Sequence, residues 1–377
     1  MRFNPDIGRL GFYIVKKVQF MKKVKVIVVG CGNMGSSHAR AYDKLDEFEI
    51  VGIVDANPKA VEAFNASVGK QYPYFSDFDE ALAKASPDAV AICTYPASHE
   101  PLAVKAMEAG CHVFVEKPIS STVEGAMRVV ECAKKLNKKV VVGYILRHHP
   151  SWIKFIELAH TLGTPLVMRM NLNQQSHGKT WQGHKNLLKS LTPIVDCGVH
   201  YVDVMCQMTR SKPVRVSGIM ANLSPELSPD QRNYGQLQVT FEDGSVGWYE
   251  AGWGPMMSTN AFFVKDVIGP KGCVSICAKN AGSENKSDDI DSHTKTEQLR
   301  YHSSEMLPDG SWAHEDQWID TKDEPKHDDL CAREQLYFYK AIVDGTDLSD
   351  HLSDAVNSLK IVLAADESAR TGKTIEL

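Results

Sequence analysis

An otherwise apolar stretch, residues 194–205, carries three ionisable side chains, Asp196, His200 and Asp203. Residues three or four positions apart lie on one face of a helix, so the spacing predicts that all three point the same way. A neutral histidine can accept the proton of a hydroxyl group, and a neighbouring carboxylate can orient the substrate or raise basicity. The alternative is a buried hydrogen-bonded cluster that only fastens the helix to a sheet.

A lysine ends a second apolar run. Lys117 follows Glu116 and precedes Pro118, which restricts its backbone. In an open parallel sheet, ligands bind beyond the carboxyl ends of the strands. A lysine at that edge can hydrogen-bond a substrate hydroxyl and stabilise negative charge that develops on its oxygen. An ordinary surface lysine is the alternative, and the acid–base pair of Asp196 and His200 favours the catalytic interpretation.

A glycine triplet follows the apolar run 24–29. It reads G-C-G-N-M-G, and the segment after it can begin a helix. The first glycine permits a tight turn, the second lets the backbone approach a pyrophosphate, and the third allows close helix–sheet packing. The anion then lies at the helix N-terminus. A purely steric turn is the alternative; otherwise the loop binds a dinucleotide through Gly30, Gly32, Asn33, Met34 and Gly35.

An acidic residue at the expected distance favours the phosphate-binding interpretation. Asp55 stands 20 positions after Gly35, at the end of the second strand-like run. In dinucleotide-binding folds a carboxylate there binds the ribose hydroxyls. It would also repel a 2′-phosphate, so the sequence predicts NAD as the cofactor rather than NADP.

The elements that must position these residues follow an alternating pattern in the first 145 residues. Helix-like segments at 35–43, 59–67, 78–83, 97–109 and 122–136 separate apolar runs at 25–29, 49–55, 89–94, 112–116 and 140–143. Such alternation predicts an α/β Rossmann fold, with a doubly wound parallel sheet.

The pattern of apolar and polar residues changes after residue 150. The runs at 166–172, 214–220, 235–241, 245–252 and 261–268 alternate in polarity, which is typical of an antiparallel sheet with one covered face. One helix is expected at 193–209, and two more end the chain at 330–343 and 353–370. We therefore predict an extension (1–20), an NAD-binding Rossmann domain (21–146) and an α+β substrate-binding and oligomerisation domain (147–377), whose terminal helices can pack back on the Rossmann domain.

The bulk composition excludes several classes of partner. Of 377 residues, 43% are hydrophobic and 24% charged, and the formal net charge is −5, so no basic field for nucleic acid is expected. The apolar runs are too short to span a bilayer, and residues 1–20 lack the pattern of a signal peptide. Nine cysteines without a C-x-x-C pair predict reduced thiols in a cytoplasmic protein.

The polar segment 279–328 contains several histidines: His293, His302, His314 and His327. Their spacing fits no pattern of metal ligands. A solvated insertion is therefore predicted, and no metal site is expected.

The sequence resembles the Gfo/Idh/MocA family, the group of glucose–fructose oxidoreductase, inositol dehydrogenase and MocA. The resemblance rests on G-C-G-N-M-G at Gly30, E-K-P at 116–118 and D-C-G-V-H-Y-V-D at 196–203. It covers residue 24 to about residue 275 and resumes in the terminal helices. The family's second domain is mostly antiparallel, and its open sheet often mediates dimers or tetramers. A homodimer or homotetramer is therefore expected.

The resemblance also implies roles for individual residues. It places Lys117, Asp196 and His200 at the positions of the family's catalytic trio. Three further positions match residues that commonly line the nicotinamide half of the cofactor site: Thr94, His99 and Glu116. Family substrates are typically sugars, sugar derivatives, cyclitols and related polyols.

The chain departs from the family pattern in two places. Thr94-Tyr95-Pro96 stands where many members read Thr-Pro-Asn, and 191–194 replaces a glycine pair. Segment 173–188 could face a carbohydrate, since an aromatic plane suits a sugar face, or be an ordinary exposed loop. The substrate candidates from these regions are His177 and Trp181, with Arg147 from the end of the fifth strand.

Three functions compete. The first is an NAD-dependent dehydrogenase that moves a hydride between a secondary alcohol of a sugar or cyclitol and the nicotinamide. The second retains NAD and cleaves a glycosidic bond by transient oxidation and elimination. The third, a non-catalytic dinucleotide-sensing regulator, predicts loss of the lysine or the histidine, whereas both are present.

Overall fold

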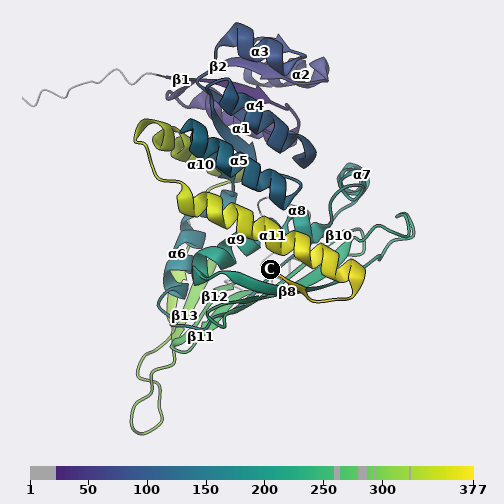
Figure 1. The fold of residues 1–377 in the computed structure, drawn as a ribbon. Coiled ribbons are helices and arrows are strands. Elements are labelled where there is room, and N and C mark those ends of the chain that lie inside the picture. The colour runs from purple at the N-terminus through teal and green to yellow at the C-terminus, as the bar shows by residue number, and fades with distance from the viewer. Residues whose placement is uncertain (1–22, 259–263, 279–286, 290, 292–293, 322–323) are drawn as a thin grey trace, which may run out of the picture.

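The computed structural model describes residues 23–258, 264–278, 287–289, 291, 294–321 and 324–377. The predicted extension, 1–20, lies outside these residues, as do His293 and the first part of the strand predicted at 261–268. Two sheets form the molecule, one above the other in Figure 1, with the final long helix running between them. Among the described helices, none has the length and hydropathy needed to cross a bilayer.

The first sheet is parallel throughout, with strand order β3-β2-β1-β4-β5-β6. Its central strands are short valine- and isoleucine-rich runs buried on both faces, as parallel sheets require. The order reverses beside β1, which creates the crevice where such sheets bind ligands. The predicted doubly wound sheet is confirmed, with one unpredicted two-residue strand, β3. The strands are β1 (Val24–Val29), β2 (Phe48–Val54), β3 (Tyr74–Phe75), β4 (Ala89–Ile92), β5 (His112–Glu116) and β6 (Val140–Gly143).

Helices connect these strands and mostly begin at a capping side chain. Asn57, Asp77 and Thr122 accept backbone hydrogen bonds at the starts of α2, α3 and α5. Helix α1 differs, because no side chain of the described residues caps its start at Gly32. The helices are α1 (Asn33–Lys44), α2 (Pro58–Val68), α3 (Phe78–Ala85), α4 (His99–Glu108), which follows the short η1 (Pro96–Ser98), and α5 (Val123–Leu136).

The second sheet has nine strands in the order β14-β13-β12-β11-β7-β10-β9-β8-β15. Among the paired described strands only β7 and β10 run parallel, so the prediction of a mainly antiparallel sheet is confirmed. The strands are β7 (Val167–Gln175), β8 (Pro213–Ala221), β9 (Tyr234–Phe241), β10 (Val246–Gly254), β11 (Lys265–Gly269), β12 (Gly272–Cys277), β13 (Gln298–Ser303), β14 (Gln317–Asp320) and β15 (Ile375–Glu376).

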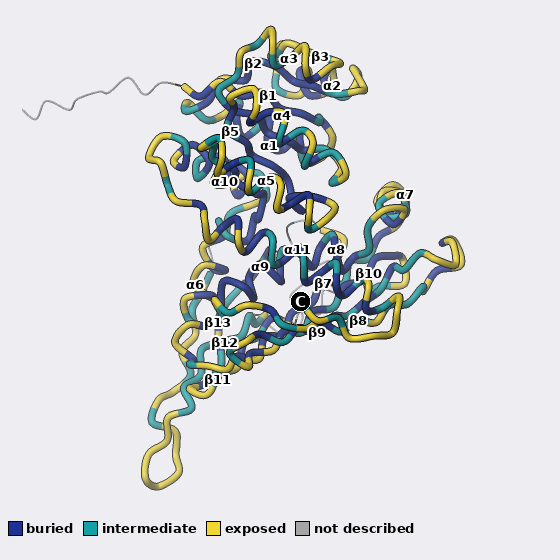
Figure 2. The backbone as a smooth tube through the Cα atoms, in the orientation of Figure 1, coloured by how far each residue is buried: buried dark blue, intermediate teal, exposed yellow. Residues whose placement is uncertain are grey.

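Helices α9 and α11 cover one face of this second sheet, and one buried cluster runs from the parallel sheet through them (Figure 2). Helix α10 packs instead on α1, and its Phe338 and Tyr339 contact Phe48 of β2. The division of the chain at residue 146 stays a prediction. The helices are η2 (Ile145–His148), α6 (Pro150–Ala159), α7 (Gly178–Leu187), α8 (Pro193–Asp196), α9 (Gly198–Thr209), α10 (His327–Val343) and α11 (Ser349–Thr371).

The helix predicted at 193–209 is two helices, which corrects the sequence analysis. Helix α8 ends at Asp196 and α9 begins at Gly198. A Cβ atom on Gly198 would lie 3.1 Å from Cε1 of Tyr249, so this position must lie close to β10. The break therefore falls where the chain passes tightly over the second sheet.

Helix α6 begins at a buried histidine. His149 accepts a hydrogen bond from the amide of Ser151 at its Nδ1 (3.3 Å), and its side chain is fully buried. Burial, with smaller contributions from Arg333 and Lys265, lowers the pKa of His149 to about 4. In the unfolded chain the imidazole of His149 therefore takes up a proton near pH 6.5, but in the folded chain it does so only near pH 4.

Acidification from pH 7.5 to pH 5 should thus lower the free energy of unfolding by about 2 kcal/mol through His149 alone. Urea unfolding at both pH values measures the change. His149→Asn keeps an N-cap acceptor without a titrating group, so its stability should fall less over this range. Equal losses in the two proteins would contradict this account of His149.

Candidate active site

A cavity of about 200 Å³ lies where the carboxyl ends of the parallel strands meet the second sheet. Its walls come from α1, from the ends of β5 and β6, from η2, from the helices α7 to α10, and from β7 and β10. Five of the predicted site residues line it together: Met34, Glu116, Lys117, Asp196 and His200. The fold thus brings Lys117 next to Asp196, which lies 79 positions later in the chain.

Lys117 is held by Asp196. Its Nζ lies 3.0 Å from Oδ1 of Asp196 and 3.1 Å from the carbonyl oxygen of the same residue, and both side chains are mostly buried. Burial alone would lower the pKa of Lys117, but the negative charge of Asp196 and its neighbours raises it above its ordinary value. Lys117 is therefore an ammonium group at neutral pH and can donate to a ligand oxygen.

His200 occupies the first turn of α9 and lines the same cavity. The ring of Tyr144 lies edge-on to it, with centroids 6.0 Å apart. An imidazole beside a lysine–carboxylate pair can accept a proton from a hydroxyl group that Lys117 contacts. The roles of Lys117, Asp196 and His200 are proposals that rest on this arrangement.

Two predictions near this site need correction. Asp203 does not join Asp196 and His200, because it is buried and makes a bidentate ion pair with Arg147 (Nε to Oδ2, 2.8 Å). Arg147 also donates to Asp354 at 2.9 Å, and it does not line the cavity. A buried guanidinium needs such carboxylates. The Arg147–Asp203–Asp354 group therefore ties α9 and α11 to the end of β6.

The glycine loop has the shape that a pyrophosphate needs. Gly30 has φ +88°, and a Cβ there would lie 2.6 Å from the carbonyl oxygen of Cys93. A Cβ on Gly35 would lie 1.8 Å from the carbonyl oxygen of Gly30, whereas one on Gly32 would meet no described atom within 4 Å. The space above Gly32 is open at the uncapped start of α1, where backbone N–H groups favour an anion. These residues fit a dinucleotide phosphate.

Asp55 follows β2 and supports this loop directly. Its Oδ2 accepts a hydrogen bond from the amide of Cys31 (2.6 Å), and its Oδ1 accepts one from the amide of Asn57 (2.7 Å). A carboxylate has about four lone-pair positions, so acceptors remain for ribose hydroxyls. The side chain thus both shapes the loop and offers a negative charge beside it.

Glu116 is buried behind Lys117. Its Oε1 lies 2.7 Å from Nε2 of His38, and its Oε2 accepts the amide of Lys117 at 3.0 Å. Burial opposes ionisation, but the hydrogen bond from His38 and the charge of Lys117 together lower the pKa of Glu116 below its ordinary value. Glu116 is an ionised group that fixes the backbone amide of Lys117.

His99 lies between two backbone carbonyls. Its Nδ1 is 2.7 Å from the oxygen of Pro118 and its Nε2 is 2.9 Å from the oxygen of Thr94. The ring is fully buried, and neither His99 nor Thr94 lines the cavity. His99 therefore holds the chain together just after β4 and β5. It could influence a bound nicotinamide only by positioning the backbone of these segments.

Segment 173–188 contributes a residue other than the two predicted. His177 is exposed before α7, and Trp181 is buried away from the cavity under the ammonium of Lys185. His184 lines the cavity and stacks on Trp253, with centroids 4.5 Å apart and planes 12° apart. Burial lowers the pKa of His184 to about 4, so its ring is neutral.

Gln174 completes this group, since its Oε1 accepts a hydrogen bond from Nε1 of Trp253 at 3.0 Å. The sequence pattern pointed to the segment that contains His184 and Gln174 but to neither residue, and it gave no indication of Trp253. The alternating polarity of β7 and β10 was the only sequence pattern that bore on Gln174 and Trp253. It indicates which residues share a face, but not that the two strands lie side by side.

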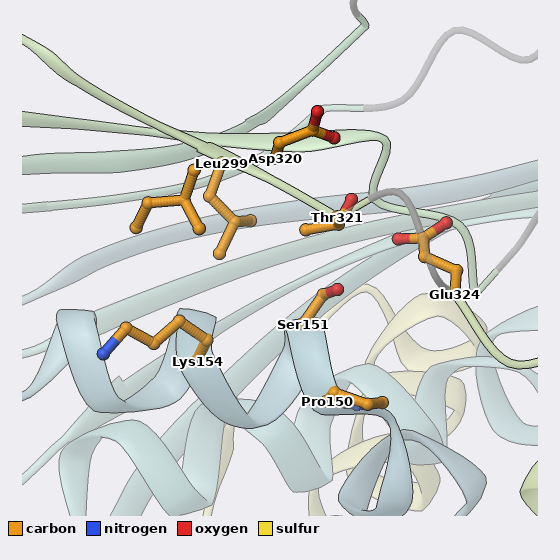
Figure 3. A pocket seen from close by; sticks show the side chains of 8 residues that line it. Pro150, Ser151, Lys154, Leu299, Asp320, Thr321 and Glu324 are labelled. Atoms are coloured by element: carbon orange, nitrogen blue, oxygen red, sulfur yellow. The ribbon is translucent and has the colours of Figure 1, made fainter.

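A larger cavity of about 470 Å³ lies between α6 and the strands β13 and β14 (Figure 3). Lys154 and Glu324 are at opposite ends of it, and Ser151 lies between them. None of the residues predicted for the active site is among those that line it. We therefore assign the chemistry to the smaller cavity that contains Lys117.

A parallel sheet with an open phosphate loop, and ionisable side chains gathered beyond its strand ends, is the arrangement of a dinucleotide-binding protein. Two family models match the chain: the oxidoreductase family with an NAD-binding Rossmann fold over residues 24–144, and the GFO/IDH/MocA C-terminal domain over residues 156–273. The chain belongs to the Gfo/Idh/MocA family, and its first domain is an NAD-binding domain.

Curated relatives include inositol 2-dehydrogenase from Paracoccus denitrificans, which is 28% identical over 187 residues (48% of this chain and 53% of that protein). The inositol 2-dehydrogenase of Corynebacterium glutamicum is 33% identical over 201 residues, or 52% of this chain and 57% of the relative. The chain spans about half the length of the curated relatives it matches.

Solved structures match over almost their whole length. Scyllo-inositol dehydrogenase from Lactobacillus casei, with bound NAD(H) and scyllo-inositol, has a TM-score of 0.75 at 21% identity, covering 94% of this chain and 99% of the other. UDP-N-acetylglucosamine 3-dehydrogenase GnnA from Acidithiobacillus ferrooxidans has a TM-score of 0.72 at 19% identity, covering 93% and 99%. At these identities the likeness establishes the fold alone.

Proposed function

We propose that this protein is an NAD-dependent oxidoreductase that transfers a hydride between a secondary alcohol of a sugar, sugar derivative or cyclitol and the nicotinamide ring. The observation that carries the proposal is the meeting of Lys117, Asp196 and His200 in one cavity at the carboxyl ends of the parallel strands. Bound NAD supplies the hydride acceptor. Gly30, Gly32, Asn33, Met34, Gly35 and Asp55 would hold it.

Three residues of the chain have separate roles in the reaction. Lys117 donates a hydrogen bond to the reacting hydroxyl oxygen and stabilises negative charge there. Asp196 holds the ammonium group in place, as its 3.0 Å contact with Nζ indicates, and orients the substrate. His200 accepts the hydroxyl proton when the alcohol is oxidised and returns it in the reverse direction.

A polyol substrate is supported by the other end of the cavity. The stacked rings of His184 and Trp253 offer a flat surface next to the amide of Gln174, and flat rings beside hydrogen-bonding groups suit a sugar or cyclitol face. Inositol dehydrogenases among the relatives point to the same substrate class.

A panel of sugars and cyclitols incubated with NAD tests the proposal. Steady accumulation of NADH, followed by its near-ultraviolet absorbance, is the expected result with at least one compound. Cleavage of a glycoside without net NADH would instead favour the redox-cycling glycosidase. Tight NAD binding with no turnover of any compound would favour the dinucleotide-sensing regulator.

We also propose that the protein is a cytoplasmic homodimer or homotetramer. All nine cysteines are free thiols, as expected in a reducing compartment. The face of the second sheet opposite α9 and α11 exposes Val167, Val246 and Ile268, each about 40% accessible, from three neighbouring strands. A second copy would cover such a face, and the mass of the protein in solution tests this.

A further inference from the structure

A second group of metal-binding residue types lies where α10 packs on α1. His327, Cys331 and Glu334 follow one another at intervals of four and three positions, so they share one face of α10. His38 faces them from α1. One ligand atom from each of His38, Cys331 and Glu334 lies within 4.8 Å of the others, and all three residues are buried.

The distances suit coordination by a single ion. Sγ of Cys331 lies 3.7 Å from Nδ1 of His327. In a tetrahedral zinc site with bonds of about 2.0–2.3 Å, neighbouring ligand atoms are about 3.5 Å apart. His327 is therefore at a ligand's distance from Cys331. It lies outside the compact group of His38, Cys331 and Glu334, so its ring must turn toward the other two to complete the site.

Glu334 provides the second, independent observation. Its Oε1 is buried and has no hydrogen-bond partner among the described residues. A buried polar atom without a partner is costly, and a cation would supply the partner that the protein does not. The carboxyl group lies on the helix face that carries His327 and Cys331.

His38 makes the hydrogen bond to a carboxylate that metal-binding histidines usually make through their second ring nitrogen. Its Nε2 pairs with the Glu116 carboxylate at 2.7 Å, which leaves Nδ1 as the ligand atom. Nδ1 now accepts from Nε2 of Gln335 at 2.9 Å, so an ion would displace this amide. The carboxylate–histidine pair is the usual second shell of a zinc ligand.

We propose that His38, His327, Cys331 and Glu334 bind a zinc-class metal ion that clamps α10 to α1 at one end of the cavity that contains Lys117. A thiolate and imidazoles favour Zn²⁺ over Mg²⁺ or Ca²⁺. The proposal does not rest on the dehydrogenase activity, although His327 and Glu334 also line the cavity that contains Lys117. It also revises the prediction of no metal site, because His38 lies 289 positions before His327 and no local spacing pattern could link them.

Titration of the metal-free, full-length protein with Co²⁺ tests the site. We expect one ion per chain, with thiolate-to-cobalt charge-transfer absorption in the near ultraviolet that Zn²⁺ abolishes by competition. Zn²⁺ should also raise the melting temperature, since it binds the folded state. Cys331→Ala should remove the charge-transfer band and weaken Zn²⁺ binding by roughly 100-fold, because loss of even a second-shell partner typically costs 10- to 100-fold.

Cys111→Ala is the matched control, since Cys111 is also a buried free thiol but lies outside the group. It should keep the band. If Cys331→Ala does not fold, as judged by circular dichroism, His327→Ala replaces it and should weaken binding similarly. The proposal is overturned if the wild type shows no charge-transfer band, if Cys331→Ala or its substitute binds normally, or if Cys111→Ala alone loses the band.

Discussion

Lys117→Ala is expected to lower kcat by about 10³-fold, in the range that acid–base and hydrogen-bonding groups contribute to catalysis, while NAD affinity stays nearly unchanged. The ammonium group contacts Asp196 in the substrate cavity, whereas the phosphate loop and Asp55 belong to other strand ends. Steady-state kinetics with the best polyol substrate and direct titration with NAD measure the two effects separately.

Stability must be measured in the same experiment. Removal of Lys117 leaves the Asp196 carboxylate without its ammonium partner, so the melting temperature of the variant should fall. Lys154→Ala is a suitable control, because Lys154 lies on α6 in the second cavity and should not affect turnover. A folded Lys117→Ala variant with full activity would remove this lysine from the mechanism.

Asp55→Ala should weaken NAD binding by roughly 10- to 100-fold, because hydrogen bonds to a charged group contribute about 1.5–3 kcal/mol. It should also relax discrimination against NADP, since the charge that repels a 2′-phosphate is removed. Dissociation constants for NAD and NADP, compared between the wild type and the variant, measure both effects.

The structure allows the two roles of Asp55 to be separated. Asp55→Asn retains an acceptor for the amide of Cys31 but removes the negative charge. We expect it to bind NAD better than Asp55→Ala does, yet to accept NADP almost as readily. A wild type that already prefers NADP would show that the assigned role of Asp55 is wrong.

Local sequence patterns were sufficient for the parallel sheet. Residues 24–29 and 140–143 are valine-rich runs buried on both faces, and such runs leave few alternatives to a central strand. The glycine loop and Asp55 could be predicted equally well, because their spacing along the chain reflects a local strand–turn–helix geometry.

Contacts between distant segments could not be predicted in this way. Asp203 has the correct helical spacing from His200, but Arg147 and Asp354 determine where its carboxylate points. Trp253 reaches the cavity only because β10 pairs with β7. Periodicity reports which face a residue occupies, and it contains no information about the segment that will cover that face.

The packing of α10 on α1 has a consequence for synthesis of the chain. Tyr42 and Phe48 belong to the first third of the sequence, yet Gln335 and Phe338 cover them from near its end. A nascent chain that has just completed β6 must therefore expose these aromatic rings until α10 has also left the ribosome. The cofactor half of this protein is encoded first, but it acquires its final surface last.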